Sequence, residues 1–428
     1  MTEDGPATAD MTVCGLGYVG MALARDATAA GLTVLGYDVN ADLVAALRAD
    51  HSHVDDVFNE DLAAMNATGF TATADPAVLG RSPVVVICVP TPLGDDGGPD
   101  LGAVLRATAE TGARMRPGAL VVLESTSFPG TTEEVVGPIL ERESGLAAGT
   151  GFHLAFSPER IDPGNKVYTM AKTPKVVGGL TPACADRAVE FYGRFTDEVV
   201  RARGTREAEM AKLLENTYRH VNLGLINEVA MLCHRMGIDV WDVIECARTK
   251  PFGFQAFQPG PGVGGHCIPV DPLYLAHKAR AVGFASRMID AAERVNSAMP
   301  GYVVERCAAL LRSRGREPAG TSVLLLGVTY KADVADLRMT PAEEVARRLR
   351  GHGAAVSYHD PYVDAWTVDG EPVPSHGDLR SALRSADLTV LLQKHSRYRP
   401  ETLVSEAHLV FDARGLLADH PDRHVAVL

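Results

Sequence analysis

The chain has 428 residues, 46 % hydrophobic and 22 % charged, a composition typical of a folded globular protein with more than one domain. Its formal net charge of −13 argues against a nucleic-acid partner, because proteins that bind nucleic acid usually carry a basic face. No apolar run approaches the length of about 20 residues that crosses a membrane. Residues 1–10 lack the features of a secretion signal, and we expect them to form a disordered tail.

The seven cysteines are scattered along the chain and odd in number. The absence of any CxxC pair disfavours both a disulfide framework and a zinc site. We therefore expect a protein of the reducing cytoplasm that binds no metal and no membrane.

Strand and helix signals alternate in the first part of the chain. Short apolar runs rich in Val and Ile are typical of buried strands, and helical stretches such as 19–30 and 40–49 separate them. The strand-like runs are residues 11–14, 33–38, 84–89 and 120–124. This alternation predicts repeated βαβ units on a parallel sheet.

The pattern changes near residue 205. Apolar residues follow helical spacing from 205 to 236 without a turn signal, which predicts one long helix, and further helices are expected at 273–299 and 302–314. Strand-like runs then return, with a helix at 341–350 among them, at residues 322–327, 355–358, 388–392 and 408–412. The predicted fold class is α/β: two Rossmann-like parallel-sheet domains joined by a central all-helical domain with a long connecting helix.

A glycine motif directly follows the first predicted strand. Gly15, Gly17 and Gly20 form GxGxxG and lead into helix-forming residues, the arrangement of a dinucleotide-binding turn. Asp38 ends the second strand, where a carboxylate can bind the adenosine ribose hydroxyls. No arginine follows it to meet a 2′-phosphate, so the motif predicts NAD rather than NADP. The alternative is a glycine turn with an unrelated aspartate.

A second loop rich in glycine and proline, residues 259–265, leads to His266 and Cys267. Its backbone can wrap a ligand and present a thiol, which acts as a nucleophile when a neighbouring group activates it. Taken alone, Cys267 is equally compatible with a small buried hydrophobic residue. Lys212 and Asn216 lie earlier, at positions i and i+4, and share one face of the long predicted helix.

Six motifs together resemble the UDP-glucose/GDP-mannose dehydrogenase family. The resemblance runs from residue 11 to about 415, and six motifs in the family's order make it specific. The motifs are GYVG at 17–20, EST with PGTT at 124–132, SPER at 157–160, ExxKxxxN at 209–216, GGHCIPVDP at 264–272 and GVTYKADxxDxR at 327–338.

The resemblance implies an NAD-dependent oxidation of the C6 alcohol of a sugar nucleotide to a carboxylate. Cys267 would attack the C6 aldehyde, and a second oxidation would leave a thioester for water to hydrolyse. Lys212 and Asn216 would stabilise the developing oxyanion. Asp271 and Thr126 would hold the water, and Glu159 would be the general base for hydrolysis.

Ligand contacts follow from the same resemblance. For NAD the expected contacts are Gly15, Gly17, Tyr18, Val19, Gly20, Asp38, Pro90, Thr91 and Thr126. For the sugar nucleotide they are Glu159, Arg160, Lys212, Asn216, Phe252, Phe257, Gly262, Gly264, Gly265, Lys331 and Arg338.

The expected domains also follow the family. They are the tail (1–10), an NAD-binding Rossmann domain (11–204), a central helical domain (205–300), a connecting helix and linker (301–319) and a sugar-nucleotide-binding Rossmann-like domain (320–428). The central helices would form a homodimer, with residues 210–229 as the contact.

Two departures bear on the substrate. The cysteine loop of glucose-oxidising members usually reads like GGSCxPKD, whereas this chain has His266 and Val270 in place of the serine and the lysine. The loop looks more like the UDP-N-acetylhexosamine branch, particularly the UDP-N-acetylglucosamine 6-dehydrogenases, so a UDP-N-acetylhexosamine is the expected substrate.

UDP-glucose and dTDP-glucose stay open as alternative substrates. A two-electron dehydrogenase of the hydroxyacid type, which needs no thiol, and a nucleotide-sugar-binding protein without catalysis also stay open.

Overall fold

The computed structural model describes residues 9–54, 56–94, 97–161, 168–420 and 422–428. The chain divides into two compact units, Met1–Glu215 with Leu273–Phe284, and Asn216–Pro272 with Ala285–Leu428. Residues 1–8 of the expected tail lie outside the described residues. The last two residues of that stretch belong to the fold, because Ala9 is buried and the Asp10 carboxylate accepts a hydrogen bond from Thr33 N at 2.8 Å.

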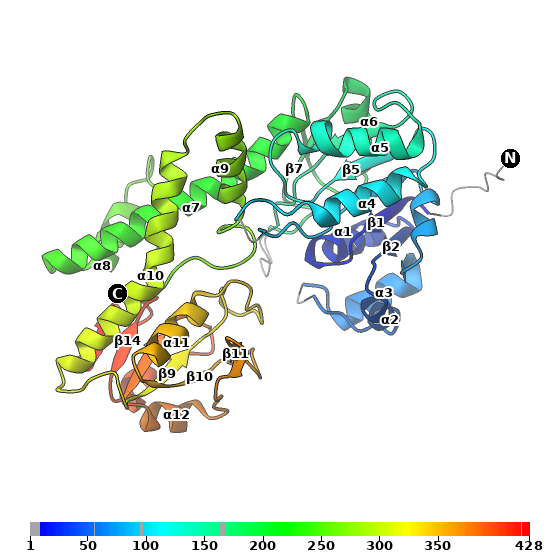
Figure 1. Cartoon of the computed structure of the whole chain (residues 1–428). Helices are drawn as coiled ribbons and strands as arrows, with labels where there is room; N and C mark the ends of the chain where they lie inside the picture. The colour runs from blue at the N-terminus through cyan, green and yellow to red at the C-terminus, as the bar shows by residue number, and fades with distance from the viewer. Residues whose placement is uncertain (1–8, 55, 95–96, 162–167, 421) are drawn as a thin grey trace. The chain divides into compact units, whose positions relative to one another are not determined.

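The first unit is built on an eight-stranded sheet of order β3-β2-β1-β4-β5-β6-β7-β8 (Figure 1). Neighbouring strands pair in parallel except β6 and β7. The strand order reverses at β1 and β4, and ligands of such sheets bind at the carboxyl ends of the strands at this point. The strands are β1 (Met11–Cys14), β2 (Val34–Tyr37), β3 (Phe70–Thr73), β4 (Val84–Ile87), β5 (Leu120–Leu123), β6 (His153–Phe156), β7 (Lys175–Gly179) and β8 (Val199–Arg201).

Both faces of this sheet are covered. Because successive side chains of a strand point to opposite faces, Val84 and Val86 of β4 belong to one core and Val85 and Ile87 to the other. The helical elements of this unit, including a 3-10 helix η1 and a π-helical turn η2, are α1 (Tyr18–Ala29), α2 (Ala41–Arg48), α3 (Asn59–Thr68), η1 (Pro76–Gly80), α4 (Gly102–Gly112), η2 (Thr132–Val136), α5 (Gly137–Ser144) and α6 (Pro182–Tyr192).

The long helix is confirmed as α7 (Thr205–Met236), and α8 (Val240–Arg248) follows it. The predicted helix break near residue 300 is wrong, because α9 spans Asp271–Ala281 and α10 spans Arg287–Arg312 through Pro300. Gly283, with a φ of +78°, turns the chain out of α9, and Phe284 N donates to Ala279 O at 2.8 Å. Pro300 removes one backbone donor, but the helix continues through it.

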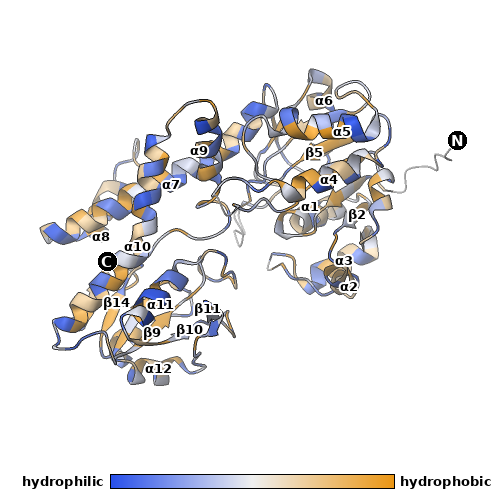
Figure 2. Cartoon of the chain, in the orientation of Figure 1, coloured by the Kyte–Doolittle hydropathy of each residue, from blue (hydrophilic) through white to orange (hydrophobic). Residues whose placement is uncertain are grey.

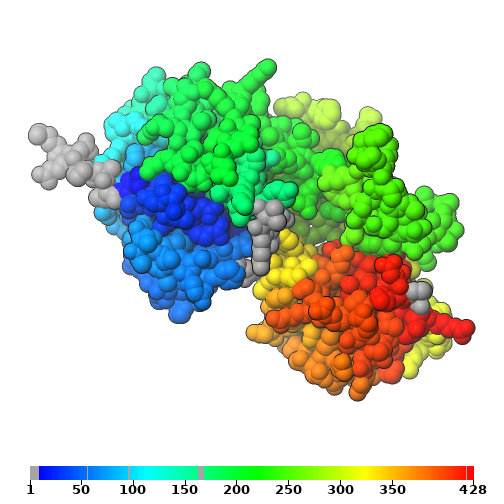
Figure 3. Space-filling view, turned by 180° about the vertical axis from the view of Figure 1, so that it is seen from behind, coloured from blue at the N-terminus to red at the C-terminus, as the bar shows by residue number. Residues whose placement is uncertain are grey.

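The second unit carries a five-stranded parallel sheet of order β10-β9-β13-β14-β15. Its C-terminal segments, orange to red in Figure 3, pack into one body. The strands are β9 (Ser322–Leu326), β10 (Ala355–His359), β13 (Leu388–Leu391), β14 (Val410–Asp412) and β15 (Val425–Val427), with a hairpin of β11 (Thr367–Val368) and β12 (Glu371–Pro372). The helices are α11 (Pro341–Gly351), α12 (Leu379–Ser385) and α13 (Pro400–Glu406). Among the described residues, no helix has the length and apolar character to cross a membrane.

The same hydrogen-bonded turn follows the first strand of each of the two sheets. Leu16 N, after β1, donates to Asp38 Oδ2 at 2.9 Å, and Val328 N, after β9, donates to Asp360 Oδ2 at 2.7 Å. In both sheets the carboxylate follows the neighbouring parallel strand. The prediction of two Rossmann-like parallel sheets is therefore confirmed.

Candidate active site

The GxGxxG turn of the first unit has the shape that a dinucleotide requires. Gly15 has a φ of +96°, and a Cβ there would lie 2.7 Å from Cys88 O. A Cβ on Gly20 would lie 1.9 Å from Gly15 O, so α1 can pack against the turn only with glycine at this position. Gly17 is exposed, and a Cβ on it would meet nothing within 4 Å. This open side of the first turn of α1 is where backbone N–H groups can bind a pyrophosphate.

Asp38 is held beside this turn by the backbone. Its Oδ2 accepts from Leu16 N and its Oδ1 from Asn40 N, both at 2.9 Å. The carboxylate is therefore fixed where the ribose hydroxyls of NAD can donate to it. Tyr18 and Val19 lie half-buried in the first turn of α1. The residues present fit NAD.

The remaining predicted NAD contacts follow β4 and β5, the neighbours of β1. Pro90 is exposed and Thr126 half-buried, while Thr91 is buried. Because β1, β4 and β5 are parallel, these residues lie at the same edge of the sheet as the glycine turn. The Thr91 carbonyl also accepts a hydrogen bond from the Tyr274 hydroxyl of α9, a contact that no sequence motif indicated.

Lys212 and Glu159 are joined directly in the first unit. Lys212 is buried on α7, and its Nζ donates to the Glu159 carbonyl oxygen at 2.5 Å. Glu159 Oε1 accepts from Arg160 N at 2.6 Å and from Ile161 N at 2.5 Å. The Arg160 guanidinium pairs with Glu215 of α7 at 2.8 Å, so its charge is used within the protein. Its contact with a sugar nucleotide stays a prediction.

Glu209 lies one turn before Lys212 on α7 and holds the PGTT segment. Its buried carboxylate accepts from Gly130 N at 2.6 Å, from Thr132 N at 2.8 Å and from Thr132 Oγ1 at 2.7 Å. Burial raises the pKa of Glu209 to about 7, although the three donors act to lower it. This contact links two of the sequence motifs and fixes the segment that follows Thr126.

We expect the Glu209→Gln variant to lose part of the pH dependence of stability. A carboxyl group whose pKa is raised by folding stabilises the fold below the ordinary value of 4.5, and this contribution is lost as the pH rises through about 7. As the pH rises from 4.5 through about 7, ionisation of Glu209 should therefore lower the free energy of unfolding of the wild type by up to about 3 kcal/mol. Denaturant unfolding at about pH 5 and about pH 8 measures the difference. The same pH dependence in both proteins would contradict the expectation.

The predicted nucleophile of the second unit lies on a turn that is anchored to α7. Asn216 Nδ2 donates to Asp271 Oδ2 at 2.5 Å, and both side chains are buried. Asp271 begins α9, and its N–H donates to the Cys267 carbonyl at 2.9 Å. Cys267 is exposed, whereas five of the seven cysteines are buried. Asn216 thus holds the turn that presents the thiol.

The glycines of the cysteine loop pack against the GVTYKAD motif. A Cβ on Gly264 would lie 2.7 Å from Tyr330 Cβ, and one on Gly265, whose φ is +86°, would lie 2.7 Å from the Tyr330 ring. A Cβ on Gly262 would lie 3.1 Å from Pro341. Gly264 and Gly265 are therefore needed for close packing within the unit, and the φ of +139° at Gly262 also favours glycine. Their contact with a sugar nucleotide stays a prediction.

Arg338 lies near this loop. Gly265 N donates to the Arg338 carbonyl at 3.0 Å. The Arg338 guanidinium forms a bidentate ion pair with Asp336, in which Nε donates to Oδ1 at 3.0 Å and Nη2 donates to Oδ2 at 2.6 Å. The hydrogen bond to Asp336 raises the pKa of Arg338, and Cys267 adds to the effect. Burial, then the charge of Arg338, lowers the pKa of His266, which favours its neutral form. Lys331 is half-buried on the same motif.

The predicted aromatic contacts lie before the cysteine loop. Phe252 is exposed under Lys250 Nζ, which lies 5.1 Å from the ring centre, and Phe257 packs against Tyr218 with ring centres 5.9 Å apart.

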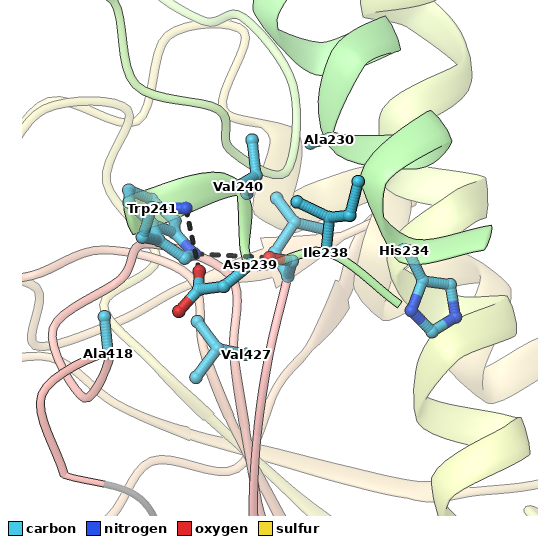
Figure 4. A pocket seen from close by; sticks show the side chains of 9 residues that line it. Ala230, His234, Ile238, Asp239, Val240, Trp241, Ala418 and Val427 are labelled. Atoms are coloured by element: carbon cyan, nitrogen blue, oxygen red, sulfur yellow. Dashed lines mark hydrogen bonds between the residues drawn. The ribbon is translucent and has the colours of Figure 1, made fainter. Parts of the chain in front are cut away.

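A separate pocket of about 160 Å³ lies around Trp241, whose Nε1 donates to Leu428 O at 3.2 Å (Figure 4). It contains none of the predicted residues and is smaller than ligand pockets of about 300 Å³ or more.

Sequence reasoning missed a buried ionic cluster in the first unit. The sequence motifs include Glu124 but neither Lys175 nor Tyr192. The available signal was a charged residue at the end of one apolar run, LVVLE, and at the start of another, KVVGG. A charge that borders a buried strand requires a partner.

Comparison with known proteins identifies the family. The chain matches the UDP-glucose/GDP-mannose dehydrogenase family in three parts: the NAD binding domain at residues 9–196, the central domain at 206–298 and the UDP binding domain at 324–419. A UDP-N-acetyl-D-glucosamine 6-dehydrogenase of Pseudomonas aeruginosa is 36 % identical over 95 % of this chain and 97 % of its own length.

Two solved structures have the same architecture. A UDP-D-ManNAc dehydrogenase from Pyrococcus horikoshii has a TM-score of 0.89 at 31 % identity, over 98 % of each chain. A UDP-glucose dehydrogenase from Pyrobaculum islandicum has a TM-score of 0.86 at 28 % identity, over 100 % of this chain and 98 % of that one. The chain therefore belongs to the UDP-glucose/GDP-mannose dehydrogenase family.

Proposed function

We propose that this protein is an NAD-dependent nucleotide-sugar 6-dehydrogenase that oxidises the C6 alcohol to a carboxylate through a thioester on Cys267. One observation carries the proposal: the exposed Cys267 lies on a turn whose Asp271 is bonded to Asn216, one helical turn after Lys212 on α7. A two-electron dehydrogenase needs no thiol in such a position. The names of the relatives support the same class of reaction.

The overall reaction converts the alcohol, two NAD⁺ and one water into the carboxylate, two NADH and three protons. NAD, when bound, supplies the hydride acceptor for each of the two oxidations. The Cys267 sulfur bonds to the C6 aldehyde carbon formed in the first oxidation, and the second oxidation leaves a thioester. Lys212 and Asn216 donate to the C6 oxygen as negative charge develops on it.

Hydrolysis then completes the reaction. Glu159 takes a proton from a water molecule that Asp271 and Thr126 hold, and the water oxygen bonds to C6 as the C–S bond breaks. The Cys267 thiolate is thereby restored.

A UDP-N-acetylhexosamine is the proposed substrate. Relatives named for N-acetylated sugars match over most of the chain, at 31 to 36 % identity. The half-buried His266 stands where the glucose-oxidising loop usually has serine. UDP-glucose and dTDP-glucose are the alternatives, because the shape of the occupied pocket decides between C2 substituents.

An NADH-release assay tests both substrate and chemistry. The panel is UDP-N-acetylglucosamine, UDP-N-acetylmannosamine, UDP-N-acetylgalactosamine, UDP-glucose and dTDP-glucose. We expect two NADH per sugar nucleotide consumed, with a uronic acid as product. A yield of one NADH without carboxylate would favour a two-electron enzyme, and no NAD reduction with any member would favour a binding protein.

We also propose that two copies of the chain pair through α7. Large apolar side chains recur on this helix at spacings of four and seven residues, and apolar colour recurs along it in Figure 2. Such a stripe is typical of a helix that packs against a partner. Its members, 38 to 61 % exposed, are Met210, Leu214, Tyr218, Leu225, Leu232 and Met236.

We expect the Leu225→Glu/Leu232→Glu variant to be a monomer, because the two carboxylates would be desolvated in a paired interface. Sedimentation or light scattering should show the wild type at twice the mass of the variant. Leu105→Glu, on an exposed leucine of α4, is the matched control and should leave the mass unchanged. A monomeric wild type would contradict the pairing.

A further inference from the structure

A row of alternating charges lies buried in the first unit at the ends of β5 and β7. Glu124 follows β5 and Lys175 begins β7, and only 1 % and 4 % of their surfaces are exposed. Lys175 Nζ lies 2.9 Å from Glu124 Oε1 and 3.9 Å from Glu159 Oε2. The Glu159 carbonyl in turn accepts from Lys212 at 2.5 Å. The order is therefore Glu124, Lys175, Glu159, Lys212, alternately negative and positive.

Lys175 is fixed by several contacts. Its Nζ donates to Pro158 O at 3.4 Å and lies 5.1 Å from the centre of the Tyr192 ring. The Tyr192 hydroxyl donates to Glu124 Oε1 at 2.5 Å, so the carboxylate beside the ammonium is held as well. Burial acts to lower the pKa of Lys175, but the attraction of Glu124 and Glu159 outweighs it and raises the pKa. The amine is therefore charged.

A buried ion pair is weak evidence for a stabilising role. Burying an ion pair requires desolvation, and well-packed apolar side chains of similar volume often serve a fold equally well. The two oxygens of Glu159 also differ. Oε1 accepts from two backbone N–H groups, whereas Oε2 is buried without a hydrogen-bond partner among the described residues and faces the Lys175 ammonium.

We infer that Lys175 is a positioning residue for the hydrolytic half of the reaction. It holds Glu159 Oε2, and Glu124 and Tyr192 hold Lys175. The inference rests on the proposed function, in which a proton moves from water to the Glu159 carboxylate while the water oxygen bonds to C6 and the C–S bond to Cys267 breaks. In the proposed reaction Glu159 moves a proton only in hydrolysis, so loss of Lys175 should slow hydrolysis of the thioester and leave the rates of the two oxidations nearly unchanged.

The Glu124→Gln/Lys175→Met variant tests this inference. The double change leaves the net charge of the cluster unchanged, and two backbone N–H groups still hold Glu159 Oε1, so the fold should be retained, with a melting temperature within about 5 °C of the wild type. NAD affinity is measured by titration. Stopped-flow mixing with NAD and UDP-N-acetylglucosamine then separates the first turnover, seen as a burst of NADH, from the steady state. Intact-protein mass spectrometry detects the acyl group on Cys267.

We expect a burst at nearly the wild-type rate, a steady-state rate lowered about a hundredfold, and accumulation of the acyl-enzyme. NAD affinity should be unchanged. A wild-type steady state would overturn the inference. So would an equal loss of burst, steady state and NAD affinity, which would mean a purely structural cluster. Lys278→Met removes a surface ammonium that pairs with Glu134 and is the matched control.

Two further variants keep the test decisive. Glu124→Gln alone leaves one lysine and one glutamate, a balanced pair that should fold, and its steady state should fall about tenfold with the burst retained. An unchanged ratio of burst to steady state there would contradict the inference. Glu159→Gln should accumulate the same acyl-enzyme. If Glu159→Gln accumulates no acyl-enzyme, the proposed role of Glu159 is wrong. If Glu159→Gln accumulates the acyl-enzyme and the double variant does not, only the role of Lys175 is contradicted.

Discussion

Replacing Cys267 with serine should abolish formation of the uronic acid, with a loss of at least about a thousandfold in turnover. A serine hydroxyl at this position is a far weaker nucleophile than a thiolate, and no strong base is needed to activate the thiol. The turn itself should persist, because it depends on the bond from Asp271 N to the carbonyl of residue 267 and on the Asn216 side chain. Binding of NAD and of UDP-N-acetylglucosamine should therefore be retained.

The measurement combines calorimetric binding with NADH release and mass spectrometry of the sugar product. Cys246→Ser is the matched control, since Cys246 is the other exposed cysteine and lies on α8. It should behave as the wild type. Substantial acid formation by Cys267→Ser would remove the covalent step from the proposed reaction.

Buried strands were the part of the fold most visible in the sequence. The runs at 11–14 and 84–89 correspond to β1 (Met11–Cys14) and β4 (Val84–Ile87), because a strand covered on both faces consists almost entirely of apolar residues. The pattern does not predict β3, β6 to β8, the hairpin of β11 and β12, or β15. β7, for example, begins with a lysine and ends in two glycines, so its apolar part is too short to stand out.

Contacts between residues distant in sequence were not predicted by the motifs. Arg160 looks like a cation for a phosphate, but Glu215 of α7 lies opposite its guanidinium. Lys175 belongs to none of the sequence motifs, yet it lies 2.9 Å from Glu124. Both outcomes depend on which elements pack together, and residue spacing along one element carries no information on that.

Motif glycines show a related limit. Gly264 and Gly265 are predicted to contact the sugar nucleotide, and the structure shows a further role, because their missing side chains make room for Tyr330. The packing of the cysteine loop on the GVTYKAD segment becomes visible only in the fold.

Lys212→Met is expected to lower turnover by about a hundredfold to a thousandfold, the usual cost of losing a donor to a developing oxyanion. Methionine has nearly the same length as lysine and fills the buried position, so α7 should keep its packing. The lost bond to the Glu159 carbonyl should destabilise the fold by about 1 kcal/mol, a loss that thermal unfolding would detect separately from activity.

The burst of NADH distinguishes Lys212 from Lys175. If Lys212 stabilises charge on the C6 oxygen in the oxidation steps, its loss slows the burst and the steady state together, and no acyl-enzyme accumulates. Loss of the Lys175 charge should slow the steady state alone. Lys172→Met, on an exposed lysine, is the control for removal of a positive charge. A Lys212→Met variant with turnover within about threefold of the wild type would show that this ammonium only supports the Glu159 carbonyl, since catalytic donors contribute far more.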